Sequence, residues 1–309
     1  IIISSEYNYN YKKNFKFVNK IFPLKNEIKF LRKIIVLFRM IFLLRKIKYS
    51  NIIILDGKNR SFFISLFLKG KKSILLQSRN LEFLSKIFGY KRVFNYEIQN
   101  QLKNFSFLAS NLDFNIDLKK MDIYKDHSFK YLDQVNKKYI VIHLDEKWFK
   151  EFYYKDFTDI NPTSELLDIF IKKLLSTLNN EFDIVITTGS KKLDFLKKYT
   201  NDFVQSGPNQ FVKKINSSNV FFIDSCSFND LEGIIKKSSF LICCEGGVSH
   251  VSHNMNISTI AFFEKNRLQH TQFWTSHMNN LTLFERKKMT NLIEDSDFFK
   301  IIYNKILLK

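Results

Sequence analysis

The sequence has few cysteines and no long uncharged hydrophobic run. Its 309 residues include three cysteines, Cys226, Cys243 and Cys244, and no CxxC pair. This excludes a disulfide framework, so free thiols in a reducing compartment are expected. The strongest helical pattern, residues 26–48, is interrupted by Arg39. Its longest uncharged run is five residues, which excludes a membrane span.

Acidic residues are also scarce relative to basic ones. There are 49 Lys and Arg against 30 Asp and Glu, which gives a formal charge of +19. Such an excess favours a polyanionic partner, such as nucleic acid, an anionic membrane or a phosphorylated substrate. A compositional bias is the alternative, because Lys, Asn, Ile and Phe are all abundant together. With 45% hydrophobic and 26% charged residues, the chain is expected to be globular.

The helical segment 26–48 combines bulky apolar residues with many basic ones. A basic amphipathic helix can lie on an anionic membrane. It can equally cover one face of a sheet with its lysines solvated, and one helix can do both. The basic residues concerned are Lys29, Arg32, Lys33, Arg39, Arg45, Lys46 and Lys48.

Strands and helices alternate along most of the chain, which predicts an α/β fold with parallel sheets. Residues 49–57 read as a strand buried on both faces, 59–70 as a helix ending at Gly70, and 72–77 as the next strand. The pattern weakens between residues 122 and 138 and then restarts. Because 309 residues exceed what one core usually organises, we expect two Rossmann-like, doubly wound domains facing a cleft. Their predicted bounds are 1–130 and 131–309.

The second half repeats the alternation more clearly. Strands are expected at 138–145, 182–189, 219–224, 239–244 and 258–263, and helices at 164–180, 190–200, 227–238 and 248–255. Ser164 is the expected N-cap of the first of these helices. Ser227 and Asp230 have the spacing of a capping box at the start of the third.

The segment CCEGGVSHVSHN, residues 243–254, carries the strongest chemical signal. Glu245 follows a buried strand, and Gly246 and Gly247 allow close approach of a ligand to the main chain and backbone angles closed to other residues. The helix that follows presents N–H groups and a positive dipole end, which suits a pyrophosphate. His250 can donate a hydrogen bond to a phosphate oxygen. Glu245 suits sugar hydroxyls, because its charge would repel a phosphate.

Three other interpretations of this segment stay open. A glycine pair after a strand can be a simple turn. His250 and His253 could join Glu245 in holding a metal, but the set is short of ligands at a recognised spacing, so no metal is expected. Cys244 and His250 could form a nucleophile pair, yet a thiol within an apolar strand is usually inert.

Residues 234–264 resemble the donor-binding segment of glycosyltransferase family 9, the heptosyltransferase-like enzymes. The family has an acidic residue, then a small residue and Gly, and shortly after them a His. Glu245 stands where the family more often has Asp, Gly246 takes the small-residue position, and Gly247 and His250 match unchanged.

The resemblance extends over nearly the whole chain. It implies that Lys147, before Trp148, meets a donor phosphate and that Asp194 holds the nucleotide ribose. Residues 48–61 resemble a strand and turn of the first domain, where Lys58 and Arg60 are the acceptor-binding candidates.

The resemblance implies a GT-B-like enzyme that transfers a sugar, heptose or similar, with inversion. The donor would be a nucleotide-diphosphate sugar resembling ADP-heptose, and the acceptor a phosphorylated lipid-linked saccharide such as lipopolysaccharide core. No metal or cofactor is expected. The expected location is cytoplasmic, with peripheral attachment to the anionic inner face of the inner membrane.

One departure from the family concerns the catalytic base. The family carries a general-base Asp on the first strand-to-helix loop, whereas Ile1 to Asn8 resembles the second strand. The base is therefore expected upstream of Ile1, and Asp56 is the rival within the chain.

Two other functions stay as alternatives. A nucleotide-sugar epimerase shares this architecture and needs no acceptor. A nucleic-acid-binding protein would fit the charge of +19 and the 16% aromatic content. That function needs basic residues interleaved with exposed aromatics, whereas the phenylalanines fall mostly in apolar strands and helices, so no nucleic acid is expected.

Overall fold

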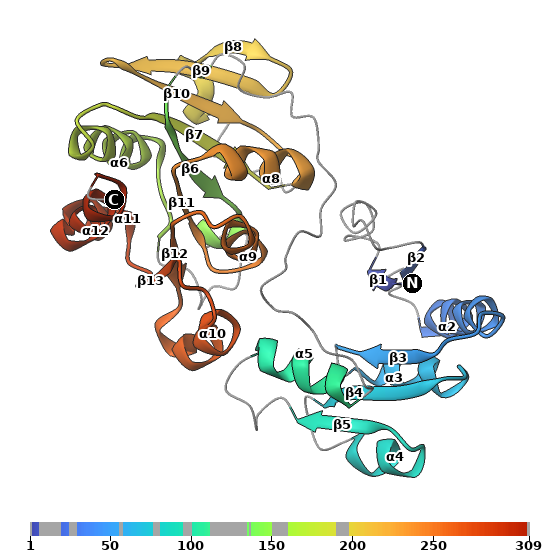
Figure 1. Ribbon diagram of the computed structural model, residues 1–309. Helices are drawn as coiled ribbons and strands as arrows, with labels where there is room; N and C mark the ends of the chain where they lie inside the picture. Colours follow the sequence, from blue (N-terminus) through green and yellow to red (C-terminus); the bar gives the residue numbers. More distant parts are fainter. Residues whose placement is uncertain are drawn as a thin grey trace. The chain divides into compact units, whose positions relative to one another are not determined.

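The computed structural model describes residues 2–5, 20–24, 30–55, 58–76, 81–94, 101–111, 135, 137–149, 160–189 and 198–307. The chain divides into two compact units, Ile1–Asp126 and His127–Lys309 (Figure 1). Both contain parallel strands with helices between them, so the predicted α/β class is confirmed. The assignment of an acceptor role to residues 1–130 and a donor role to 131–309 stays a prediction.

The first unit has two small parallel sheets, β1–β2 and β3–β4–β5. Each parallel pair in the larger sheet is joined through a helix, as such pairs require. The strands are β1 (Ile2–Ser5), β2 (Ile21–Leu24), β3 (Asn51–Ile54), β4 (Lys71–Leu76) and β5 (Lys91–Phe94). The helices are α2 (Phe30–Leu44), α3 (Asn59–Leu66), α4 (Glu82–Ile87) and α5 (Gln101–Ser110).

Alternate residues of β4 pack against different helices. Ile74 and Leu76 join a cluster with Phe62 of α3, while Leu75 packs on Leu108 of α5. Because successive strand side chains point to opposite faces, α3 and α5 cover opposite faces of this sheet. The helix predicted over 26–48 packs its buried side on α3 and contacts Ile52 of β3.

Two predictions in this unit are wrong in detail. The strand after Ser50 was expected to be buried on both faces, but Ile53 and Leu55 are exposed and only Ile54 is buried. Helix α3 packs against Ile54 and so covers one face of β3, and the opposite face, with Ile53, stays exposed. The helix expected to end at Gly70 ends at Leu66, and a short turn reaches the glycine.

The second unit is built on one eight-stranded sheet. Its strands are β6 (Tyr139–Leu144), β7 (Asp183–Thr188), β8 (Val204–Gly207), β9 (Gln210–Ile215), β10 (Ser218–Ile223), β11 (Phe240–Cys244), β12 (Thr259–Phe263) and β13 (Leu281–Glu285). The α-helices are α6 (Ser164–Thr177), α8 (Phe228–Lys237), α9 (Gly247–Asn254), α10 (Leu268–Thr275), α11 (Met289–Glu294) and α12 (Ser296–Leu307). Short 3-10 turns are η3 (Glu146–Trp148), η4 (Thr200–Asp202) and η5 (Lys265–Arg267).

The order of the strands is β13-β12-β11-β6-β7-β10-β9-β8. The six strands from β13 to β10 are parallel, and β9 and β8 continue the sheet antiparallel. Helices α6, α11 and α12 pack on one face, and α8 and α9 on the other, which Figure 1 shows on the two sides of the sheet. The predicted doubly wound arrangement is therefore present in this unit.

Local patterns predicted most of these elements, with some exceptions. Ser227 caps α8 by accepting a hydrogen bond from the Asp230 N–H at 3.2 Å, as predicted. The cap of α6 is Thr163 and not Ser164, since the Thr163 hydroxyl accepts from Leu166 N at 3.2 Å. The helix expected at 190–200 lies mostly outside the described residues.

The strands β8 and β9 were not predicted. Asn209 and Asn216 take positive φ values of 58° and 53° in the turns on either side of β9. Asparagine tolerates this conformation better than most residues, so these turns reverse the chain and create the antiparallel pairs.

A buried histidine in β6 generates a prediction about pH. His143 places Nδ1 3.0 Å from the Thr187 hydroxyl of β7. Burial, and then the Lys147 charge, lower its pKa from 6.5 to about 4. Between these values the unfolded chain binds a proton that the folded chain does not, so the free energy of unfolding falls as the pH drops.

We expect His143→Gln to remove part of this pH dependence while keeping a polar partner for Thr187. Between pH 7 and about pH 4.5 its loss of stability should be smaller than that of wild type by roughly 2–3 kcal/mol. Urea unfolding at the two pH values measures this, with exposed His270→Gln as the control. Equal pH dependence in wild type and His143→Gln would contradict the assignment.

Candidate functional site

The candidate site lies where the strand order of the second unit reverses. Strands β6 and β11 are hydrogen-bonded neighbours, with Ile142 opposite Ile242. From β6 the chain proceeds outward through β7 and β10, whereas from β11 it proceeds in the other direction through β12 and β13. The loops leaving two such strands diverge, and ligands of open α/β sheets bind in the crevice they leave.

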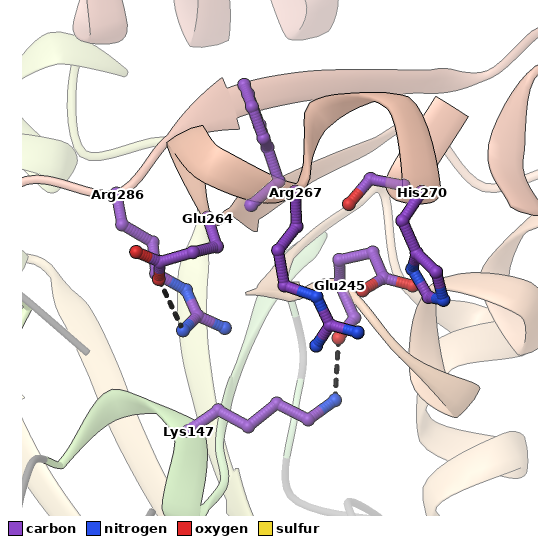
Figure 2. Close-up of a pocket in the computed structure, with 8 residues that line it drawn as sticks. Lys147, Glu245, Glu264, Arg267, His270 and Arg286 are labelled. Carbon is purple, nitrogen blue, oxygen red and sulfur yellow. Dashed lines mark hydrogen bonds and ion pairs between the residues drawn. The ribbon is translucent and has the colours of Figure 1, made fainter. Parts of the chain in front are cut away.

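Lys147 bridges the two loops at this point. Asp145 follows β6 and accepts a hydrogen bond from the Lys147 N–H at 3.1 Å, which begins η3. The Lys147 ammonium then donates to the Glu245 carbonyl oxygen after β11 at 2.6 Å (Figure 2). It also lies 4.0 Å from a carboxylate oxygen of Asp145. The cation is therefore fixed in place beside the main chain of the glycine segment.

The next residue after Glu245 must be glycine. Gly246 has φ +155°, and a Cβ built on it would lie 2.2 Å from the Lys147 ammonium nitrogen. A side chain here would be strained and would displace that cation.

Gly247 was expected to need glycine for the same conformational reason, and this is wrong. It is the first residue of α9, its φ is not positive, and the space around an added Cβ is open. That open space still allows a ligand to approach its backbone.

Ser249 closes the start of α9 by a reciprocal pair of contacts. Its hydroxyl donates to the Gly246 carbonyl at 2.7 Å and accepts from the Gly246 N–H at 3.3 Å. The Lys147 ammonium lies beside Gly246, the residue that directly precedes this helix. Helix N-termini favour anions, and a cation at the same place adds to that preference.

His250 belongs to a group of three histidines. Its ring centroid lies 6.2 Å from that of His277, which in turn lies 5.1 Å from that of His253. Asn280 holds His253 through a 2.7 Å contact between its amide oxygen and Nδ1. Burial, with the nearby His277, His253 and Lys147, lowers the pKa of His250 to about 4. At neutral pH this side chain is an uncharged hydrogen-bonding group.

A hollow opens beside Lys147, and the space in it together with the solvent at its open mouth is about 370 Å³. One wall is the pair Lys147 and Glu245, and the other comes from the ends of β12 and β13 and the start of α10 (Figure 2). The full lining is Lys147, Glu245, Phe263, Glu264, Arg267, His270, Thr271 and Arg286.

The wall from β12 and β13 was not predicted. Arg286, which is buried, pairs with Glu264 at 3.5 Å, so this charge is held in a fixed position. Figure 2 shows Arg267 extending toward the same space as Lys147. The signal was present in the sequence, because Glu264 and Arg267 directly follow a predicted parallel strand, where side chains gather at the carboxyl edge. The hollow thus mixes cations, carboxylates and neutral hydrogen-bonding groups.

Burial also sets the chemistry of groups beside the hollow. It raises the pKa of Asp145 to about 6, against the opposing charge of Lys147. It raises the pKa of the Cys243 and Cys244 thiols, and all three cysteines are free and buried. A thiolate nucleophile at Cys244 is therefore disfavoured. Among the described residues no group of His, Cys, Asp and Glu could hold a metal ion.

The structure brings some of the predicted site residues together. Lys147, Glu245 and Gly246 are in contact, Gly247 follows them, and His250 lies on α9 without lining the hollow. In the first unit, Lys58 is exposed just before α3 and Arg60 lies in its first turn. Asp56 and Asp194 lie outside the described residues. The binding roles of all these residues stay predictions.

The sequence matches no protein-family model and no curated protein. The fold, in contrast, matches solved structures over nearly the whole chain. Escherichia coli heptosyltransferase WaaC with ADP is 12% identical with a TM-score of 0.61, covering 97% of this chain and 89% of that one. A family 9 glycosyltransferase from Veillonella parvula is 11% identical with a TM-score of 0.56, covering 94% and 75%.

An enzyme with a different activity also matches. The UDP-GlcNAc 2-epimerase from Neisseria meningitidis bound to UDP-GlcNAc is 10% identical with a TM-score of 0.51, covering 98% of this chain and 86% of that one. At such low identity these likenesses show the fold alone. They confirm the predicted resemblance at that level: the chain has the GT-B fold found in the family 9 heptosyltransferases and in UDP-GlcNAc 2-epimerases.

Proposed function

We propose that this chain is a glycosyltransferase that transfers a sugar, heptose or similar, from a nucleotide-diphosphate donor to a lipid-linked saccharide such as lipopolysaccharide core. One observation carries the proposal: the Lys147 ammonium is fixed against the main chain that begins α9, at the point where the strand order reverses. A cation and a helix N-terminus at one place form a site for a diphosphate. WaaC, which shares the fold, was solved with ADP.

In this proposal Lys147 neutralises the donor diphosphate. An ammonium carries three N–H donors, and its contact with the Glu245 carbonyl sets the direction of the group. Asp145 acts as a positioning residue, since it holds the Lys147 N–H and lies near the ammonium. As the sugar leaves, negative charge develops on the diphosphate, and a fixed cation stabilises it without rearrangement.

The remaining groups suit a sugar better than a second phosphate. The Glu245 side chain lines the hollow, and carboxylates accept hydrogen bonds from hydroxyls. Glu264 and Thr271 line the same space. His250, uncharged at neutral pH, is proposed to donate a hydrogen bond to the donor rather than a positive charge.

Inversion needs a general base that deprotonates the acceptor hydroxyl. The two predicted sources, an Asp upstream of Ile1 and Asp56, both lie outside the described residues. The proposal for the donor site does not depend on which of them acts, because binding of the donor precedes proton transfer.

A nucleotide-sugar 2-epimerase is the second candidate, favoured by the shared fold of the enzyme solved with UDP-GlcNAc. The two functions differ in their need for an acceptor. A transferase should release nucleoside diphosphate only when a saccharide acceptor is present, whereas an epimerase converts the donor alone.

Product analysis tests the two functions directly. We expect ADP-heptose with a lipopolysaccharide-core acceptor to yield ADP and extended acceptor, and UDP-GlcNAc alone to remain unchanged. Formation of the epimer from UDP-GlcNAc alone would replace the transferase proposal. Binding of neither nucleotide sugar, measured by calorimetry, would contradict both functions.

Lys147→Ala should weaken binding of the nucleotide sugar. A lost charge-assisted hydrogen bond costs about 1.5–3 kcal/mol, so the dissociation constant should rise roughly ten-fold or more. Calorimetry on the folded variant measures this. Lys172→Ala is the matched control, because Lys172 is exposed on α6 and pairs with Asp168 at 3.0 Å, away from the hollow. An unchanged constant for Lys147→Ala would assign that lysine a structural role only.

The two glycines should respond differently to alanine. Gly246→Ala meets both positive φ and the Lys147 ammonium, so we expect lower thermal stability and weaker donor binding. Gly247→Ala lies in a helix with open space, so stability should rise by about 0.4–1 kcal/mol while donor binding weakens. Thermal unfolding and calorimetry on both variants separate the effects. Full donor affinity in Gly247→Ala would show that no ligand approaches that backbone.

A further inference from the structure

Helix α2 has an exposed apolar face in addition to its buried one. Met40, Ile41 and Leu44 are buried against α3. On the other side, four large apolar residues are 54–73% exposed: Leu31, Ile35, Phe38 and Phe42. Their spacing of four, three and four residues aligns them in one row along the helix. This row is not needed for the core of the unit.

Helix α3 widens this exposed row. Phe63 is 38% and Phe67 is 49% exposed. The rings of Phe38 and Phe63 meet edge to face with centroids 6.5 Å apart, and those of Phe63 and Phe67 lie 5.2 Å apart. We call the continuous surface the apolar strip; it consists of Leu31, Ile35, Phe38, Phe42, Phe63 and Phe67.

Basic side chains border the apolar strip. The Lys46 ammonium lies 4.4 Å from the centroid of the Phe42 ring, which ties the charge to the strip. Arg32 and Arg39 are exposed on the same helix, beside the row. Between Ile28 and Leu81 the sequence has thirteen basic residues and one acidic residue. The strip therefore lies in a strongly positive part of the chain.

We propose that the apolar strip docks this protein on an anionic lipid surface. The apolar row would enter the boundary between headgroups and acyl chains, and the bordering Arg and Lys would meet lipid phosphates. The proposal is one of lying on the surface: none of the described helices is long and apolar enough to cross a bilayer. It rests on the first unit alone and holds or fails independently of the donor site.

The composition of the strip favours lipid over nucleic acid. Single strands are bound by aromatic rings on which bases stack, and a phosphate-binding surface needs no apolar row. Leu31 and Ile35 are the most exposed members of the row, and an aliphatic side chain offers a base no stacking partner. Acyl chains, in contrast, accept aliphatic and aromatic groups alike.

Vesicle co-sedimentation of the full 309-residue chain tests the proposal. We expect binding to phosphatidylcholine vesicles that contain phosphatidylglycerol, and much weaker binding to phosphatidylcholine alone. Added salt should weaken binding, because exposed charges are screened beyond about 8–10 Å at moderate ionic strength.

Charge removal gives the first variant. Arg32→Gln, Arg39→Gln and Lys46→Gln together should reduce binding to the anionic vesicles on the order of 100-fold, since each basic residue near the surface contributes roughly a factor of five. The matched control combines Lys214→Gln, Lys288→Gln and Lys300→Gln, three exposed lysines of the second unit. Circular dichroism should show both variants folded.

Insertion of the apolar row is tested separately. Phe42→Trp should show a blue shift of its emission on the anionic vesicles, relative to wild type with its two native tryptophans. Phe38→Ser with Phe42→Ser should weaken binding and leave the remainder more sensitive to salt. Ile169→Ser is the control, because Ile169 is a large apolar residue of α6 in the second unit that is 48% exposed.

Four results would overturn the proposal. Equal binding to neutral and anionic vesicles would contradict the contact between the basic residues and lipid phosphates. An unshifted Phe42→Trp emission on vesicles would contradict insertion of the apolar row. Salt-dependent binding to single-stranded DNA that the triple charge variant loses, without vesicle binding, would make the partner a nucleic acid. A concentration-dependent dimer abolished by Phe38→Ser with Phe42→Ser, without vesicle binding, would make it a second copy of this chain.

Discussion

The contact between the Lys147 ammonium and the Glu245 carbonyl organises the candidate site. It joins residues 98 positions apart. It exists because β6 and β11 are adjacent parallel strands, and the strands that follow each of them lie on opposite sides of the pair. Both loops leave the sheet at its carboxyl edge, so a side chain of one meets the main chain of the other. The contact in turn requires that residue 246 have no side chain. The order of the strands therefore explains why Lys147, the Glu245 carbonyl and Gly246 meet at one place.

Burial determines the charge of the groups around this contact. Burial lowers the pKa of His143, with the Lys147 charge second, and it lowers the pKa of His250, where His277 and His253 precede Lys147 as further causes. Burial raises the pKa of Asp145 in spite of the Lys147 charge. The adjacent thiols are pushed toward the neutral form. An anionic ligand would therefore meet cations in fixed places, Lys147 and the Arg286 that Glu264 holds, beside neutral imidazoles. This distribution suits a ligand with a charged diphosphate and an uncharged, hydroxyl-rich sugar.

The two proposals for this chain are physically compatible. A lipid-linked acceptor stays in the plane of a membrane, so an enzyme that docks on that surface searches two dimensions for it. The apolar strip belongs to the first unit and the diphosphate site to the second, and the chemistry of each is complete within its own unit. The strip and the diphosphate site share no residue. A variant that loses vesicle binding can therefore still be tested for donor binding, and the reverse also holds.

The sequence by itself determined much of the second unit. Its apolar runs predicted the parallel strands, the Ser227 and Asp230 spacing predicted a cap, and the glycine segment after β11 predicted the start of a helix, because each pattern reflects interactions within a few residues. It also predicted the fold class, through a resemblance that the solved structures support for the fold. Tertiary structure alone decided that Gly246, and not Gly247, must be glycine, since the obstacle is a lysine from another strand. It alone decided that Ile53 and the outer row of α2 stay exposed and that Glu264, Arg267 and Arg286 complete the hollow. Those features depend on which distant segments pack together, and no local pattern carries that information.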